Sequence, residues 1–173
     1  MRIKEILRSD DSQVNFAGGL WQVGEFLHKI GCWGEAALVQ RITHHHMKAI
    51  YGNDHPDTIS AISGFANTLV VQGKLEEAAA INKEVLEKRQ QILGDDHPDT
   101  ISAMNNLANT LGDQGKLEEA AAMMKEVLEK SQQTLGDDHP DTISAMNNLA
   151  STLGDQGKLE EAAAMKKEVL EKS

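Results

Sequence analysis

Three consecutive histidines, His44, His45 and His46, are the residues of this sequence that most resemble a metal site. Imidazole nitrogens bind transition metals, and ligand pairs on a helix stand at positions i and i+4. Successive residues of a helix point about 100° apart, so three in a row cannot converge on one ion. We therefore interpret them as solvated or partly buried side chains, and we expect neither a metal nor a cofactor.

The other reactive side chains have no partner that a motif would supply. Cys32 follows Gly31 at the junction of two expected helices, with no base placed beside it. The sequence contains no phosphate-binding loop, no Gly-x-Ser-x-Gly elbow and no zinc-ligand spacing. Its repeated Asp-Asp-His-Pro-Asp segment lacks the alternating oxygen ligands of a calcium loop. This pattern favours a protein that is not an enzyme.

Paired asparagines offer a different chemistry, that of binding. Asn105-Asn106 returns 42 residues later as Asn147-Asn148. An amide carries both donors and an acceptor, so a row of amides can bind the backbone of an extended peptide whatever its side chains. Helix interiors disfavour asparagine mildly, so propensity gives no reason for the pairs. The alternative is that they are simply solvated polar residues.

Composition limits the partners that such a surface could meet. Of 173 residues, 40% are hydrophobic, which is enough for a core. The net charge of −10 disfavours nucleic acid and anionic membranes as partners. The single cysteine, the lack of an apolar run of about 18 residues and the absence of a signal-peptide centre in Met1–Asp10 indicate a cytoplasmic protein.

The elements that carry these residues are repeated. His55, His97 and His139, each followed by Pro-Asp, recur every 42 residues. Segments 94–131 and 136–173 differ at only two of 38 positions, Asn109/Ser151 and Met124/Lys166. A fixed period of this size is typical of an array in which each unit buries its apolar face against its neighbours.

Each repeat has the spacing of two helices. Proline begins the first helix of a repeat and glycine ends both helices. The pattern predicts an all-α chain with helices over 14–30, 33–50, 56–72, 75–92, 98–114, 117–134, 140–156 and 159–172, and a short one over Ile3–Ser9. We expect a leading helix and linker (1–13), a degenerate first unit (14–55), and units over 56–97, 98–139 and 140–173, the last without a capping helix.

Within a repeat, Asn106-Leu107-Ala108, Gly115, Leu117-Glu-Glu-Ala120 and Val127 match the tetratricopeptide pattern. The 42-residue period resembles the kinesin-light-chain subtype, which also occurs as nearly identical C-terminal arrays of fungal NOD-like receptor NTPases. The resemblance implies a right-handed superhelical solenoid of antiparallel helix pairs. It also implies that the first helix of each pair lines a concave groove.

Carried over position by position, the resemblance places one set of side chains in the groove: Trp21, Ser63, Asn67, Asn105, Asn106, Asn109, Asp113, Asn147, Asn148, Ser151 and Asp155. None of them is Lys or Arg, so we expect a protein or peptide ligand that is neutral to basic. The chain would then be a non-catalytic interaction module of a larger cytosolic adaptor or NOD-like NTPase.

The alternative function is a structural array that stacks end to end with no groove ligand. An uncapped last unit should expose apolar residues, for which we predict Ile143, Met146, Leu153 and Val169. Such a patch would pair with itself as a C-terminus-to-C-terminus homodimer. The near-identity of the last two units also allows head-to-tail stacking.

Overall fold

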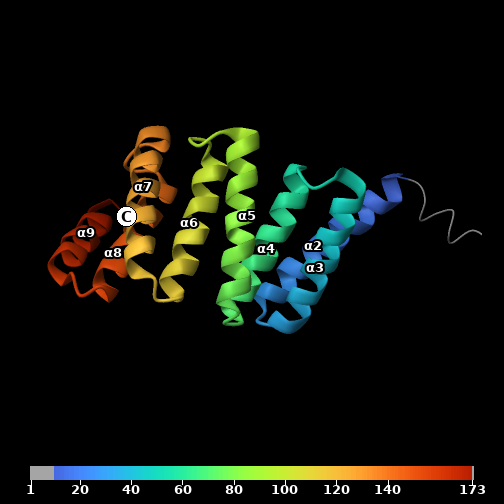
Figure 1. Cartoon of the computed structure of the whole chain (residues 1–173), viewed down its shortest axis with the longest axis horizontal. Coiled ribbons are helices and arrows are strands. Elements are labelled where there is room, and N and C mark those ends of the chain that lie inside the picture. Colours follow the sequence, from blue (N-terminus) through green and yellow to red (C-terminus); the bar gives the residue numbers. More distant parts are fainter. Residues whose placement is uncertain (1–9, 173) are drawn as a thin grey trace, which may run out of the picture. The chain divides into compact units, whose positions relative to one another are not determined.

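A computed structural model describes residues 10–172, which form eight helices joined by short turns (Figure 1). The predicted helix over Ile3–Ser9 lies outside the described residues. In chain order the helices are α2 (Asp10–Lys29), α3 (Trp33–Tyr51), α4 (Pro56–Val71), α5 (Leu75–Leu93), α6 (Pro98–Asp113), α7 (Leu117–Leu135), α8 (Pro140–Asp155) and α9 (Leu159–Lys172). The chain is therefore all-helical, as the sequence predicts.

From α3 onward the helix bounds agree with the prediction to within one residue, because the terminal signals are strong. Proline occupies the first turn of α4, α6 and α8, and Gly136 ends α7 with a φ of 92°, a conformation that glycine adopts without strain. The first helix differs, because α2 already includes residues 10–13, which the prediction left outside the helix. No proline lies in this segment, so the sequence held no signal comparable to that of the later first helices.

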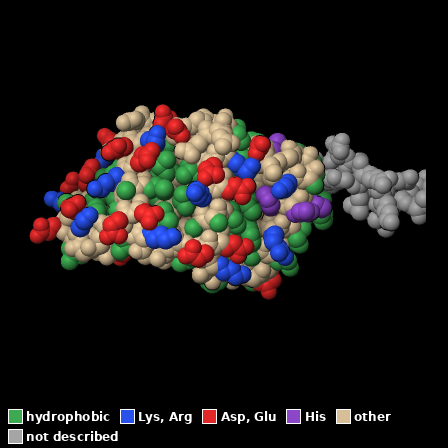
Figure 2. Space-filling view, viewed as in Figure 1, with side chains coloured by type: hydrophobic (Ala, Val, Ile, Leu, Met, Phe, Trp, Pro, Cys, Tyr) green, Lys and Arg blue, Asp and Glu red, His purple; other side chains and the backbone are tan. Residues whose placement is uncertain are grey.

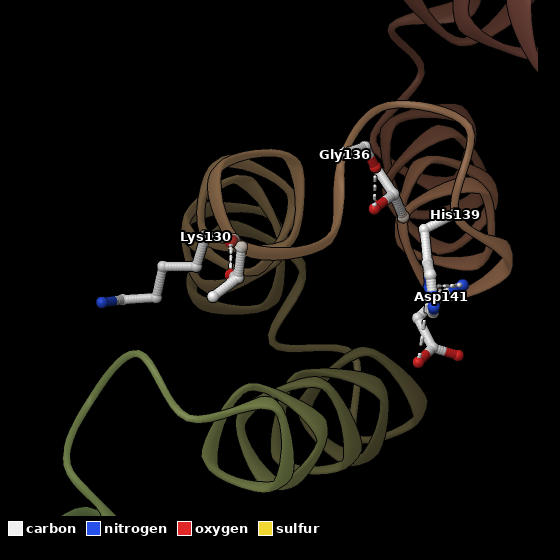
Figure 3. Close-up of polar contacts among 6 residues, drawn as sticks. Lys130, Gly136, His139 and Asp141 are labelled. Atoms are coloured by element: carbon white, nitrogen blue, oxygen red, sulfur yellow. Dashed lines mark hydrogen bonds and ion pairs between the residues drawn. The ribbon is translucent and has the colours of Figure 1, made fainter.

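Histidine caps the first helix of each clear repeat. The Nδ1 atoms of His55, His97 and His139 accept hydrogen bonds from the backbone N–H two residues later, at 3.2, 3.1 and 3.2 Å. Figure 3 shows His139 and Asp141 at the turn between α7 and α8. An acceptor at this position satisfies an N–H that has no partner within the helix. The prediction that these histidines are structural is thus confirmed.

The chain divides into two compact units, of which the first ends at Ile81. In this N-terminal unit α2 packs against α3, and α3 against α4. One cluster of buried side chains consists of Ala17, Met47 and Ala61. A second consists of Ala37, Phe65, Leu69 and Ala78.

The C-terminal unit begins at Asn82 inside α5, and each helix from α6 to α9 packs against the next one (Figure 1). Its core consists of aliphatic side chains, many of them small. The small alanine side chains let the helices approach one another closely. The buried cluster consists of Ala108, Ala121, Met124, Leu149, Leu153 and Ala162. No helix in residues 10–172 is both long and apolar enough to cross a membrane.

Successive helix pairs meet at a repeated contact. In it, the second helix of one pair packs against a buried threonine on the first helix of the next pair. In the N-terminal unit Thr68 Oγ1 donates to Gln40 Oε1 at 2.6 Å. In the C-terminal unit Thr152 Oγ1 donates to Met124 Sδ at 3.1 Å. Positions 40 and 124 are equivalent in the repeat, and Lys166 is the next equivalent residue. We call the contact between a second helix and the next first helix the joint.

The joint explains why the prediction for the open end was wrong. Met146, Leu153 and Val169 are buried, and Ile143 is half-buried. The apolar stripe of a first helix packs backward onto the preceding second helix, so α7 already covers the stripe of α8. At this end Leu159 and Leu170 of α9 are the exposed large apolar residues, 69% and 78% exposed.

Candidate binding groove

A polar stripe runs along the first helices of the C-terminal unit. On α6 it comprises Ser102, Asn105, Asn106, Asn109 and Asp113, and on α8 it comprises Ser144, Asn147, Asn148, Ser151 and Asp155. Their spacing of three and four residues puts them on one face of each helix. All are exposed or half-buried. The structure thus leaves these side chains accessible, and their role in binding remains a prediction.

The two helices exchange a hydrogen bond within this stripe. Asn148 Nδ2 of α8 donates to Asn105 Oδ1 of α6 at 3.1 Å. The bond fixes both amides, and each keeps donors and lone pairs for further partners. Sequence reasoning missed this pairing, because the two residues stand 43 positions apart and the bond depends on their rotamers.

A cavity of about 90 Å³ opens between α6, α7 and α8. Ile101 and Val127 contribute apolar walls, while Ser102, Asn105 and Ser144 contribute polar ones. Its remaining lining residues are Pro98, Ser131, Leu135, Asp141 and Ala145. The cavity is large enough for ordered water or for one small side chain.

Two polar residues of this cavity, Ser131 and Asp141, lie outside the polar stripe of α6 and α8. Asp141 stands three residues before Ser144, one helical turn earlier on the same face. Extending the stripe by one turn would therefore have found it. Ser131 is buried and lies on the second helix α7. A search restricted to the first helices therefore does not include it.

The charge of the stripe is neutral to acidic. Its only ionisable members on α6 and α8 are Asp113 and Asp155, and Asp141 adds a third carboxylate at the cavity. Burial raises the pKa of Asp113 above its usual value. Elsewhere on the visible face of the C-terminal unit, acidic and basic side chains are interspersed (Figure 2).

The N-terminal unit presents a different surface at the equivalent positions. Asn67 is exposed, but Ser63 is only 8% exposed and contributes little to a groove. The short serine does not reach past its neighbours as the longer asparagine does at position 105. Trp21 is half-buried and packs against the cluster around Met47, so it serves the core as well as the surface.

The side chains of the three consecutive histidines lie in different surroundings. His44 Nδ1 lies 3.3 Å from the carbonyl oxygen of Thr58, and the ring of His46 packs edge-on against Phe16 at 5.3 Å. His45 is exposed. Histidine side chains gather on the N-terminal unit in Figure 2, yet no three His, Cys, Asp or Glu side chains in residues 10–172 are placed to hold one metal ion.

Comparison with known proteins identifies the repeat. The sequence model of the tetratricopeptide repeat family matches residues 58–99, 100–141 and 142–173. None of the curated proteins compared with the chain matches it.

Solved structures of the same fold are numerous. The chain superposes on the nearly identical TPR-like repeats of a Podosopora anserina protein described as a putative kinesin light chain. The TM-score is 0.77, with 19% identity over 98% of this chain and 79% of that one. A variant form of those repeats gives 0.80 at the same identity and coverage. BtubC (BKLC) from P. vanneervenii gives 0.78, with 18% identity over 96% of this chain and 66% of that one.

Proposed function

The chain belongs to the tetratricopeptide repeat family, and from this premise we propose that it binds an extended peptide segment of a partner protein along the polar stripe of α6 and α8. Tetratricopeptide repeat domains are generally protein-interaction modules and are typically non-catalytic.

The observation that carries the proposal is the repetition of accessible amides. Asn105 and Asn106 on α6 return as Asn147 and Asn148 on α8, exposed or half-buried each time. An extended peptide also presents alternating donors and acceptors at regular intervals, and amides can satisfy both kinds. The cavity beside Asn105 gives one small ligand side chain a place to enter.

The ligand of this groove is neutral to basic. Binding an acidic segment would place its carboxylates near Asp113, Asp141 and Asp155 with no cation of the stripe to pair with them. A lysine or arginine of the ligand would gain charge-assisted hydrogen bonds to the same carboxylates.

A peptide array tests the proposal directly. Random extended peptides of acidic, neutral and basic composition are screened, and the affinities of the best are measured by fluorescence anisotropy. Asn105→Ala combined with Asn147→Ala should weaken binding by about 1–3 kcal/mol. The matched control is Gln91→Ala combined with Gln133→Ala, two amides 42 residues apart that are exposed on second helices.

Equal losses in the groove variant and the control variant would contradict the groove as the binding surface. Tighter binding of acidic peptides throughout the array would contradict the assignment of ligand charge. Circular dichroism of both variants must show unchanged helix content, so that loss of binding is not loss of fold.

We further propose that this module acts in the cytoplasm as part of a larger protein, either a kinesin-light-chain-like adaptor or a NOD-like signalling NTPase. The near-identity of segments 94–131 and 136–173 supports this context, since such arrays resemble those of both classes. The full-length transcript tests it: a nucleotide-binding domain on the same chain would favour the second class.

A further inference from the structure

Within residues 10–172, one face of α2 and one face of α9 are exposed at positions that lie inside a joint elsewhere in the array. We define the α2 face as Phe16, Val23, Phe26 and Ile30, and the α9 face as Leu159, Ala163, Lys166 and Leu170. We propose that the α9 face of one copy of the chain binds the α2 face of a second copy, head to tail and in the register of the repeat. The proposal does not depend on a groove ligand.

Three of the four positions of the α2 face are buried in the later repeats, where a second helix precedes them, and the fourth, that of Ile30, is half-buried there. Val23 is equivalent to Phe65 of α4 and to Leu149 of α8, which are 7% and 2% exposed, but Val23 itself is 47% exposed. Phe26 is equivalent to Thr68 and Thr152, both buried, yet it is 60% exposed. Within residues 10–172, the α2 face is thus a first-helix surface that no second helix covers.

The α9 face shows the complementary difference. Ala121 and Met124 of α7 are 5% and 3% exposed because α8 covers them. Their equivalents on α9, Ala163 and Lys166, are exposed. Since α7 and α9 are nearly identical in sequence, the α7–α8 joint shows what kind of surface covers such a face, namely the back of a first helix.

The side chains at the proposed joint are compatible in size. In the α7–α8 joint a Cβ added at Gly112 would lie 3.9 Å from Thr152 Oγ1. The equivalent glycine is Gly154, where an added Cβ would meet only the Cβ of Ala162 at 4.0 Å. The open space beside Gly154 can receive the ring of Phe26, which replaces the smaller threonine.

Charge favours this pairing over a symmetric one. In the head-to-tail joint the stem of Lys166 packs on apolar α2 residues, and its ammonium lies at the face of Phe26, a cation–π arrangement. A two-fold joint between two α9 faces would instead bring the Lys166 ammonium groups of both copies into one interface. Like charges in an interface oppose association.

Complementation between two blocked variants tests the proposal on the full chain. Phe26→Asp blocks only the α2 face, and Leu170→Asp blocks only the α9 face. Analytical ultracentrifugation should show that the unaltered chain grows in mass with concentration, whereas each variant alone stays at 18.9 kDa. Mixed in equal amounts, the two variants should form a dimer of twice that mass. The α9 face of the Phe26→Asp variant and the α2 face of the Leu170→Asp variant are both unaltered and can bind each other.

The control variant is Ile92→Asp, which alters another exposed apolar residue, 45% exposed on α5, and should associate as the unaltered chain does. If either single variant loses helix content, Ile30→Asp and Leu159→Asp replace the pair. The proposal is overturned if the unaltered chain stays monomeric at high concentration. It is also overturned if a single blocked variant still dimerises, or if the mixed variants stay apart.

Discussion

Met124 and Lys166 stand at one of the two positions that distinguish segments 94–131 and 136–173, and exchanging their residue types should have unequal consequences for stability. Met124 lies in the α7–α8 joint and is 3% exposed, whereas Lys166 is exposed at the equivalent place on α9. The perturbations are Met124→Lys and Lys166→Met. The sequence around the two positions is nearly identical. The difference between the two changes in stability therefore isolates the effect of α8, the helix that covers position 124.

The magnitude follows from burial. Met124 packs among Ala121, Leu149 and Leu153, and its sulfur accepts the hydrogen bond of Thr152. Removing a fully buried side chain of this size forfeits about 1.5–3 kcal/mol of hydrophobic stabilisation. Desolvating an ammonium adds to this, and the flexible stem relieves part of it by reaching toward water, so we expect a loss of about 3–5 kcal/mol. Lys166→Met should change stability by less than about 0.5 kcal/mol.

Urea unfolding followed by circular dichroism measures both values. The chain should carry Phe26→Asp in every sample, so that association between copies does not contribute to the measured free energy. Because each repeat contacts only its neighbours, the weakened joint should uncouple α8 and α9 from the rest. Amide hydrogen exchange in those two helices should therefore accelerate more than in α6.

Two results would refute this reasoning. The first is a loss below about 1 kcal/mol for Met124→Lys, which would mean that the α7–α8 joint does not enclose position 124. The second is an equal loss for Lys166→Met, which would mean that burial by the following helix is not what separates the two positions.

Three side-chain features of the C-terminal unit give further measurable outcomes. His97→Ala removes the acceptor at the start of α6 and should lower the free energy of unfolding by about 0.5–2 kcal/mol, while His97→Asn should restore most of it in urea titrations. Burial raises the pKa of Asp113, so its contribution to stability is full below the unfolded-state pKa and is lost as the pH rises through the folded-state pKa. Asp113→Asn should therefore raise the melting temperature at neutral pH and not at a pH of about 3, which calorimetry at the two pH values measures. A double-mutant cycle with alanine at Asn105 and Asn148 should give a coupling of about 0.5–1.5 kcal/mol, and a coupling of zero would show that the amides do not bond in solution.

Helix bounds from α3 onward could be predicted because the repeat marks them chemically. Proline begins α4, α6 and α8, and glycine with a positive φ follows the helix ends. These signals act within a few residues, so they can be recognised in the sequence. Residues 10–13 of α2 carry no such signal and were left outside the predicted helix.

The direction in which a helix packs could not be predicted from periodicity. The apolar stripe of α8 was correctly recognised, but a stripe alone does not tell whether the preceding or the following helix covers it. Met146 and Leu153 were therefore assigned to an exposed end, although they are buried. For the same reason the exposed stripe of α2 was not noticed: its equivalents in α4 and α8 are core residues.

The joint also determines how the array can change in length at the level of the gene. Each near-identical 42-residue copy carries both surfaces, a first helix that completes the joint with the preceding copy and a second helix that begins the joint with the following one. Recombination that adds or removes one interior copy therefore rejoins the same two surfaces and adds or removes one pair of asparagines in the polar stripe. Duplication of the last copy is different, because it would place Lys166 where Met124 now packs against Thr152. Copies with methionine at this position can thus vary in number without repacking, while a copy with lysine there would weaken a joint formed with a further repeat.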